Sequence, residues 1–136
     1  MRVVLDTNIL LVSIPINSRY RIIFDALLSE KYELLISNEV FLEYQKIISA
    51  KANAVVAVRT IDSLSSLKNV LKCNVFYNWN LIAQDFDDNK FVDLYVAAEG
   101  DYLVSVDSHF NVLKKISFPK VNLIDIEEFV EILKQL

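Results

Sequence analysis

The sequence predicts an α/β domain in which a central, mainly parallel β-sheet is covered by helices on both faces. Short apolar segments alternate with longer segments in which apolar residues recur at helical spacing. The 136 residues include one Gly and two Pro, so short polar turns must join the elements. The chain has no internal repeat, linker or tract of biased composition. We therefore expect residues 1–136 to form a single domain.

The first half of the chain begins with this alternation. Residues 2–5 (RVVL) indicate a short buried strand that ends in a polar triplet. A helix is expected over roughly 19–29, where apolar residues recur at helical spacing, and the next strand is expected over 34–36. Ser37 or Asn38 is a suitable N-cap for the helix that follows.

The rest of the chain continues in the same way. A helix over 53–68 precedes a strand over 70–77, and a polar run over 84–89 leads into a helix that ends before Gly100, its expected C-cap. The last elements are a strand over 102–106, a short helix over 109–115, a strand over 121–124 and a closing helix after Asp125. Ligands of such sheets bind outside the carboxyl ends of the strands. Residues that directly follow a strand are therefore the first candidates for function.

Composition excludes several classes of protein. Cys73 is the only cysteine, which excludes an internal disulfide framework and favours a reducing cytoplasm. Asp6 and Asn8 interrupt the apolar N-terminal stretch, unlike a signal peptide. No apolar run approaches the roughly 20 residues needed to cross a bilayer. We expect a soluble, cytoplasmic protein without a membrane partner.

Charge is distributed unevenly along the chain, whose formal net charge is −4. Residues 46–72 are mainly basic and residues 73–136 mainly acidic. The net charge argues against a protein that simply grips a nucleic-acid backbone. Two interpretations of the distribution stay open: solvated helix faces, or a basic segment that holds phosphates beside an acidic pocket that holds cations.

Several acidic residues stand where a site is expected. Asp6 and Asp107 each follow a predicted strand directly, although either one alone fits a turn or a helix cap equally well. Asp93 lies opposite the apolar stripe of its helix, among small and apolar residues that would partly desolvate it. Glu43 has a similar place in its own helix. Asp88 is either a ligand or a helix cap.

Grouped carboxylates repel one another, and a divalent cation relieves that repulsion. Carboxylate oxygens are ligands that Mg²⁺ and Mn²⁺ prefer, and the chain has no Cys/His cluster for a structural zinc. His109, the single histidine, is interpreted as a polar residue of its short helix and not as a catalyst. A metal held by carboxylates activates water and stabilises the charge that develops on a phosphodiester.

Four blocks of the sequence resemble the PIN domain family and occur in that family's order. They are 3–10 (VVLDTNIL), 36–44 (ISNEVFLEY), 85–93 (DFDDNKFVD) and 101–107 (DYLVSVD). The final strand and helix also fit the family's usual ending. Each block alone is weakly specific, but four in order are quite specific. The subgroup resembled comprises VapC-like ribonucleases, the toxin components of bacterial toxin–antitoxin pairs.

The resemblance implies a three-layer α/β/α sandwich and a Mg²⁺- or Mn²⁺-dependent endoribonuclease that hydrolyses RNA phosphodiester bonds. Asp6, Asp93 and Asp107 would hold the metal, with Glu43 completing the catalytic set. Supporting positions around these acids are Thr7, Asn8, Asp88, Asn89 and Ser105. The resemblance also implies an RNA substrate, a cognate antitoxin as protein partner, and a homodimer.

Two other functions compete with the nuclease. An inert PIN-like module that binds RNA or serves as a scaffold would be marked by the loss of acids, yet all four are present. A phosphoacceptor or phosphatase domain commonly has a second acid two residues after the first, where this chain has Asn8. The chain departs from the family by lacking a glycine near 31–32 and by an unusually apolar stretch at 11–16, which indicates either core packing or a dimer or antitoxin surface.

Overall fold

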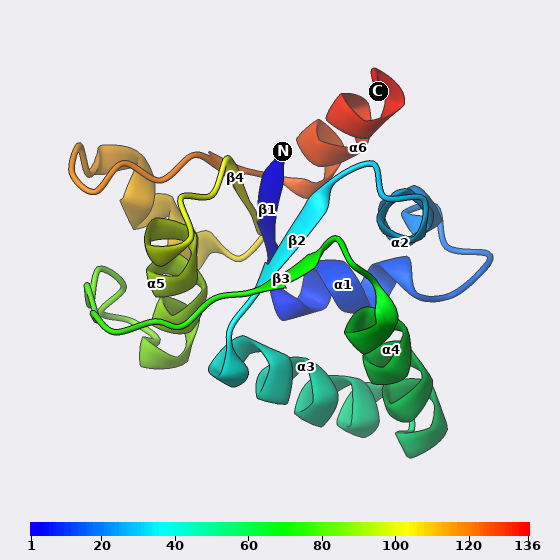
Figure 1. Cartoon of the computed structure of the whole chain (residues 1–136). Helices are drawn as coiled ribbons and strands as arrows, with labels where there is room; N and C mark the ends of the chain where they lie inside the picture. Colours follow the sequence, from blue (N-terminus) through cyan, green and yellow to red (C-terminus); the bar gives the residue numbers. More distant parts are fainter.

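The computed structural model describes residues 1–136 and contains one fully parallel, five-stranded sheet (Figure 1). Its strands are β1 (Arg2–Leu5), β2 (Glu33–Ile36), β3 (Val70–Lys72), β4 (Tyr102–Val104) and β5 (Leu123–Ile124). The strand order is β3-β2-β1-β4-β5, so successive crossovers run in one direction from β1 to β3 and return to the other side for β4 and β5. The order therefore reverses beside β1, where ligands of open parallel sheets bind.

Helices cover both faces of the sheet and confirm the predicted sandwich. The α-helices are α1 (Thr7–Ser13), α2 (Arg21–Leu28), α3 (Asn38–Lys51), α4 (Ala54–Ser66), α5 (Asn89–Ala97) and α6 (Ile126–Lys134), and the 3₁₀-helices are η1 (Phe86–Asp88) and η2 (Ser108–Lys115). In Figure 1, α5 lies on one side of the sheet and α1, α2 and α4 lie on the other. None of these helices has the length and hydrophobicity needed to cross a lipid bilayer.

Buried apolar residues of the central strands and of the helices that pack on them form the core. Val3, Val4 and Leu5 of β1 have no exposed surface, because helices pack on both faces of this central strand. Tyr44 of α3 is also fully buried, and its hydroxyl donates a 2.6 Å hydrogen bond to the carbonyl oxygen of Leu5. This bond fastens α3 to the carboxyl end of β1.

The structure differs from the predicted elements in several places. Thr7–Ser13 forms a helix that the sequence pattern did not predict, and it begins directly after β1. The strands expected over 70–77 and 102–106 end early, at Lys72 and Val104, and the strand expected over 121–124 begins late, at Leu123, because pairing with the neighbouring strands is limited to these residues. Residues 108–115 are a 3₁₀-helix and not an α-helix.

The end of α5 also differs in detail from the expected glycine cap. The left-handed residue is Glu99, with φ of 53°, and not Gly100. Gly100 follows it and donates its N–H to the carbonyl oxygen of Tyr95 at 2.8 Å. A Cβ at position 100 would lie 2.6 Å from the Tyr95 ring, so Gly100 is required by close packing.

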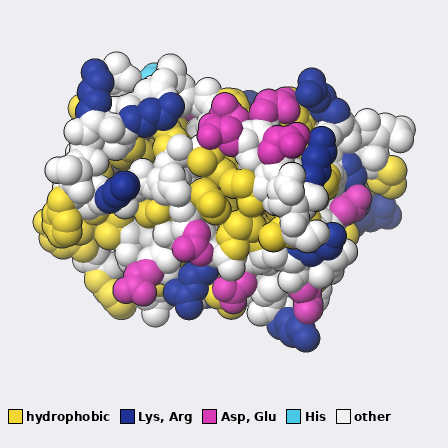
Figure 2. Space-filling model, turned by 90° about the horizontal axis from the view of Figure 1, so that it is seen from above, with side chains coloured by type: hydrophobic (Ala, Val, Ile, Leu, Met, Phe, Trp, Pro, Cys, Tyr) yellow, Lys and Arg dark blue, Asp and Glu magenta, His cyan; other side chains and the backbone are white.

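Figure 2 shows the face on which both chain termini lie, opposite the carboxyl ends of the strands. Basic side chains on this face are scattered among acidic and hydrophobic ones, and no large basic patch gathers them. Asp6 and Asp107 lie at the carboxyl edge of the sheet, on the opposite side.

Candidate metal centre

Asp6 is the central residue of the site because it directly follows the middle strand β1. Its side chain is 6% exposed. Ser105, which follows β4, donates a hydrogen bond from Oγ to Asp6 Oδ2 at 2.8 Å. Burial raises the pKa of Asp6 to about 6, and the Ser105 hydrogen bond opposes this rise. The negative charges of Glu43 and Asp107 raise the pKa further.

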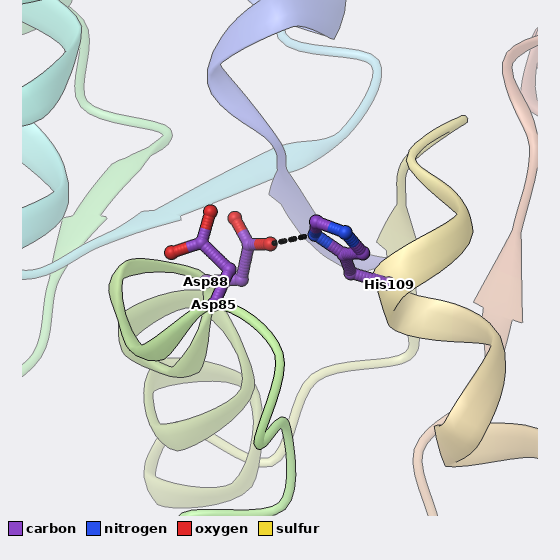
Figure 3. Close-up of side chains that lie close together, drawn as sticks. All are labelled: Asp85, Asp88 and His109. Atoms are coloured by element: carbon purple, nitrogen blue, oxygen red, sulfur yellow. Dashed lines mark ion pairs between the residues drawn. The ribbon is translucent and has the colours of Figure 1, made fainter.

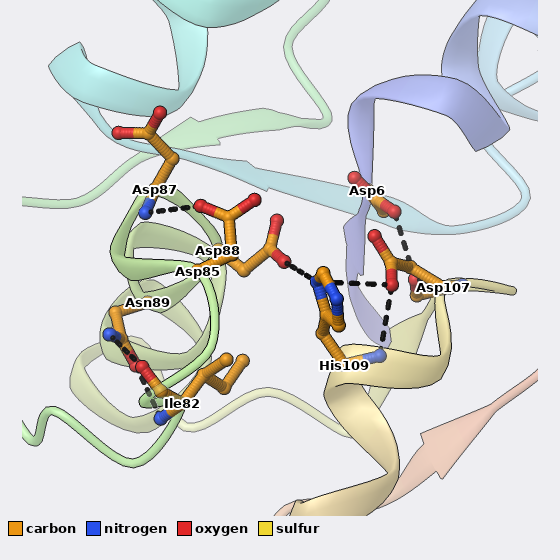
Figure 4. Close-up of polar contacts among 9 residues, drawn as sticks. Asp6, Ile82, Asp85, Asp87, Asp88, Asn89, Asp107 and His109 are labelled. Atoms are coloured by element: carbon orange, nitrogen blue, oxygen red, sulfur yellow. Dashed lines mark hydrogen bonds and ion pairs between the residues drawn. The ribbon is translucent and has the colours of Figure 1, made fainter.

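Asp107 lies beside Asp6 and also caps the next helix. Its Oδ1 accepts a hydrogen bond from the backbone N–H of His109 at 2.9 Å, which is the capping role that the sequence allowed for it. Its own backbone N–H donates to Ser105 Oγ at 3.1 Å. Ser105 therefore links Asp6 and Asp107, and Figure 4 shows both carboxylates directed toward a common region.

Asp88 directs its carboxylate toward the same region from the opposite side (Figure 4). It stands at the N-terminus of α5 but makes no capping hydrogen bond, so the cap interpretation does not hold. Its Oδ2 is shielded from solvent and has no hydrogen-bond partner. Burial raises the pKa of Asp88 to about 6, and the charges of Asp85, Asp107 and Asp6 add to the effect.

Glu43 joins the group from α3, but both of its oxygens are already engaged. Thr7 Oγ1 donates to Glu43 Oε2 at 2.5 Å, and Lys90 Nζ lies 2.6 Å from Glu43 Oε1. Thr7 thus contacts Glu43, and its supporting role in the site stays a prediction. Lys90 was not predicted, since nothing in the sequence signals that it would meet a residue 47 positions away.

Asp93 is the expected ligand that the structure does not bring into this group. Its Oδ1 accepts a hydrogen bond from the backbone N–H of Trp79 at 2.9 Å. Burial raises its pKa, and the one negative charge that adds to the effect is that of Glu39. At about 100° per residue, positions 88 and 93 lie about 140° apart around a helix. Because Asp88 faces Asp6, Asp93 faces the loop that carries Trp79.

The remaining supporting residues have different surroundings. Asn8 is exposed at the start of α1. Asn89 is buried, and its side chain makes two 2.9 Å hydrogen bonds with the backbone of Ile82, one through each amide atom. Asn89 therefore holds the loop that leads to Asp85, as Figure 4 shows, and acts on the site through the backbone.

Asp85 and His109 complete the site, and the sequence interpretation did not include them. A ligand atom from each of Asp85, Asp88 and His109 lies within 4.8 Å of the other two (Figure 3). The clustered carboxylate oxygens are hard donors of the kind that divalent cations select. The unpaired, solvent-shielded Oδ2 of Asp88 also fits a bound cation. The D-x-x-D spacing of 85 and 88 was the available signal for Asp85.

Comparisons with known proteins identify the family and the fold. Residues 2–109 match the model of the PIN domain family. No curated protein sequence matches the chain. A structure of VapBC2 from Rickettsia felis bound to a DNA fragment from their promoter is 20% identical, with a TM-score of 0.64 over 92% of this chain and 98% of that one.

Two further solved structures share the fold. VapC20 from Mycobacterium tuberculosis, described as a Sarcin-Ricin loop cleaving toxin, is 15% identical, with a TM-score of 0.59 over 88% of this chain and 98% of that one. DNA-bound VapBC from Salmonella typhimurium is 13% identical, with a TM-score of 0.56 over 93% of this chain and 98% of that one. At these identities the likeness establishes the fold.

Proposed function

This chain belongs to the PIN domain family, and we propose that it is an endoribonuclease that uses a divalent cation to hydrolyse RNA phosphodiester bonds. The observation that carries the proposal is the meeting of Asp6, Asp88 and Asp107 beside the carboxyl ends of β1 and β4. Gathering and burying like charges opposes folding, as the raised pKa values of Asp6 and Asp88 indicate. A bound cation would offset that cost, and cation binding therefore explains why the acids are gathered here.

We propose Asp6, Asp88 and Asp107 as the residues that hold Mg²⁺ or Mn²⁺, with Asp88 in the place first expected for Asp93. A divalent cation there supplies positive charge that stabilises the developing charge of a phosphodiester, and it lowers the pKa of water.

The chain's own residues then have distinct tasks around the cation. Ser105 donates to Asp6 and fixes the direction of its carboxylate. Thr7 and Lys90 fix Glu43 in the same way. Lys90 also adds a positive charge beside the acids, which reduces the repulsion that a polyanionic RNA meets on approach.

Aromatic residues near the loop that contacts Asp93 of α5 support RNA as the substrate. Phe76 is 92% exposed, and the Trp79 ring contacts those of Tyr77 and Phe118 edge to face, with ring centroids 4.8 and 5.8 Å apart. The backbone of Trp79 is bonded to Asp93 of α5, so these rings are tied to the helix that begins beside Asp88. Bases of single-stranded RNA stack on such rings. The cleavage named in the description of VapC20 also supports this substrate class.

A toxin role and a protein partner are part of the proposal. Two of the similar structures are VapBC complexes, and by analogy we propose a cognate antitoxin for this chain, in the cytoplasm. The apolar stretch at 11–16 offers it a surface, since Val12 is partly exposed and Ile16 is 80% exposed. A homodimer stays a prediction.

The test is RNA cleavage by the purified protein with Mg²⁺, Mn²⁺ or EDTA, using single-stranded, hairpin and transfer RNAs. Asp6→Asn and Asp88→Asn proteins exclude a contaminating nuclease, and Asp93→Asn is the matched control that should still cut. Cleavage that needs metal and is lost in the first two variants supports the proposal. RNA that binds but stays intact with every metal would establish the inert binding module in its place.

A further inference from the structure

His109 lies at the edge of the acidic group, where two distant parts of the chain meet. Asp85 directly precedes η1, and Asp88 is the last residue of η1. His109 belongs to η2, which follows β4. Figure 3 shows the imidazole facing the Asp88 carboxylate across the space between α5 and η2. His109 Nδ1 is 3.5 Å from Asp88 Oδ2 and 3.5 Å from Asp107 Oδ1. The ring nitrogen therefore stands between two carboxylates.

Two facing atoms in this arrangement make no hydrogen bond. His109 Nδ1 and Asp88 Oδ2 are both shielded from solvent and lie 3.5 Å apart. A proton on Nδ1 would make the two atoms an ion pair, whereas a Nδ1 without a proton is an acceptor like the carboxylate oxygen, and a cation between the two atoms would then bind both. Buried polar atoms left without partners are rare and costly, and a missing ion is one of the recognised explanations.

We propose that His109 Nδ1 is a metal ligand that acts with Asp85 and Asp88, so that the site combines nitrogen and oxygen donors and selects Mn²⁺ over Mg²⁺. The inference rests on the metal dependence proposed above and deepens it by naming a nitrogen donor. The three ligand atoms already lie within 4.8 Å of one another. No rearrangement of the backbone is needed to place a cation among them.

The preference for Mn²⁺ follows from the donor type. Mg²⁺ is a hard ion that takes oxygen ligands and gives up its water reluctantly. Imidazole nitrogen is accepted more readily by transition-metal ions than by Mg²⁺, and Mn²⁺ is the transition-metal ion that carboxylate oxygens suit best. Carboxylates alone would discriminate poorly, so His109 is the residue that sets the selectivity.

The decisive measurement is pulsed electron paramagnetic resonance of the whole protein loaded with Mn²⁺. After removal of any affinity tag His109 is the only histidine, so an imidazole ¹⁴N coupling to Mn²⁺ has a single source. The His109→Gln protein is the matched variant, and its thermal unfolding in EDTA checks that it folds. Competition titrations with Mg²⁺ give the selectivity of both proteins.

We expect a ¹⁴N coupling in the wild-type protein that disappears in His109→Gln, together with about a tenfold loss of Mn²⁺ affinity and little change for Mg²⁺. Mn²⁺ bound to the wild-type protein without an imidazole coupling would overturn the role of His109 and leave the proposed nuclease intact, because the acids alone would hold the ion. A wild-type protein that binds no Mn²⁺ would overturn both.

Discussion

The ammonium group of Lys90 lies 2.6 Å from the carboxylate of Glu43, and the two side chains are only 16% and 19% exposed. The pair joins α5, which begins beside Asp88, to α3, which Tyr44 fastens to β1. The positive charge of Lys90 thereby balances the negative charge of Glu43, and the Glu43 carboxylate is held in one orientation. The pair makes Glu43 a residue that positions the site, in contrast to the ligands with free oxygens.

Replacing Lys90 with Met should lower the free energy of unfolding by about 2 kcal/mol, because Glu43 would keep its charge without a partner in a mostly buried place. Urea denaturation of the metal-free protein measures the effect. Lys134→Met is the control, since Lys134 pairs with Glu131 on the exposed surface of α6 and should change stability by less than about 0.5 kcal/mol. Equal losses in the two variants would contradict the structural role of the pair.

Stability of the metal-free protein should increase as pH falls from 7.5 to 5, in part because of Asp6. Its pKa is about 6 in the folded protein, against an ordinary value of 3.8 in the unfolded chain. The stabilisation from its protonated form is fully present below pH 3.8 and is lost as pH rises through 6. The full effect is about 3 kcal/mol for a difference of this size. Asp6→Asn should flatten this part of the profile and raise stability at pH 7.5, measured by urea denaturation across pH.

If stability changed with pH to the same extent in the wild-type and Asp6→Asn proteins, Asp6 would not be desolvated as the structure has it. Saturating Mn²⁺ provides the complementary check. Ligand carboxylates must lose their protons to bind a cation, so Mn²⁺ affinity should weaken as pH falls.

Asp88→Asn and Asp93→Asn should differ in their effect on Mn²⁺ affinity, although both remove one negative charge. We expect Asp88→Asn to weaken binding by at least about tenfold, since its unpaired oxygen faces the other acids. Asp93→Asn should change it by less than about threefold, because an amide oxygen can still accept the Trp79 N–H. Calorimetric titration gives both values, and a larger loss for Asp93→Asn would restore the original sequence interpretation.

Phe76→Ala and Tyr77→Ala should each weaken the binding of single-stranded RNA by about 1 kcal/mol, roughly fivefold in Kd, if bases stack on these rings. Fluorescence anisotropy with a short RNA in EDTA measures binding without cleavage. Ile16→Ala removes an equally exposed apolar side chain on α1's C-terminal side and should leave RNA affinity unchanged. Equal losses in all three variants would indicate non-specific contact.

Gly100→Ala should destabilise the protein by about 2 kcal/mol, because the added methyl group meets the Tyr95 ring 2.6 Å away. The neighbouring change Glu99→Gly should instead stabilise it by up to about 1 kcal/mol, since residue 99 has a positive φ of 53°. Thermal unfolding of the two variants distinguishes them by sign. The same sign in both would refute the assigned geometry of this helix end.

Much of the fold could be predicted because its signals are local. Hydrophobic periodicity depends on neighbours along the chain, so it indicated the alternation of strands and helices and hence the parallel sheet. Local hydrogen bonding likewise predicted Ser37 or Asn38 as the N-cap of α3, which is Ser37 in the structure, and Asp125 at the start of α6, where it forms a capping box with Glu128. The helix of residues 7–13 was missed because its apolar residues continue a strand-like run.

The sequence by itself determined the fold class, the family resemblance and the positions of Asp6 and Asp107 after their strands. Only the tertiary structure decided which other acids join them. The direction of Asp88 and Asp93 depends on where α5 begins and how it turns against β1, and this placed Asp88 inside the group and Asp93 outside it. Lys90 meets Glu43, and His109 meets Asp88, across chain separations that no local pattern encodes. Side-chain direction in a helix is set by packing, and packing is a property of the whole chain.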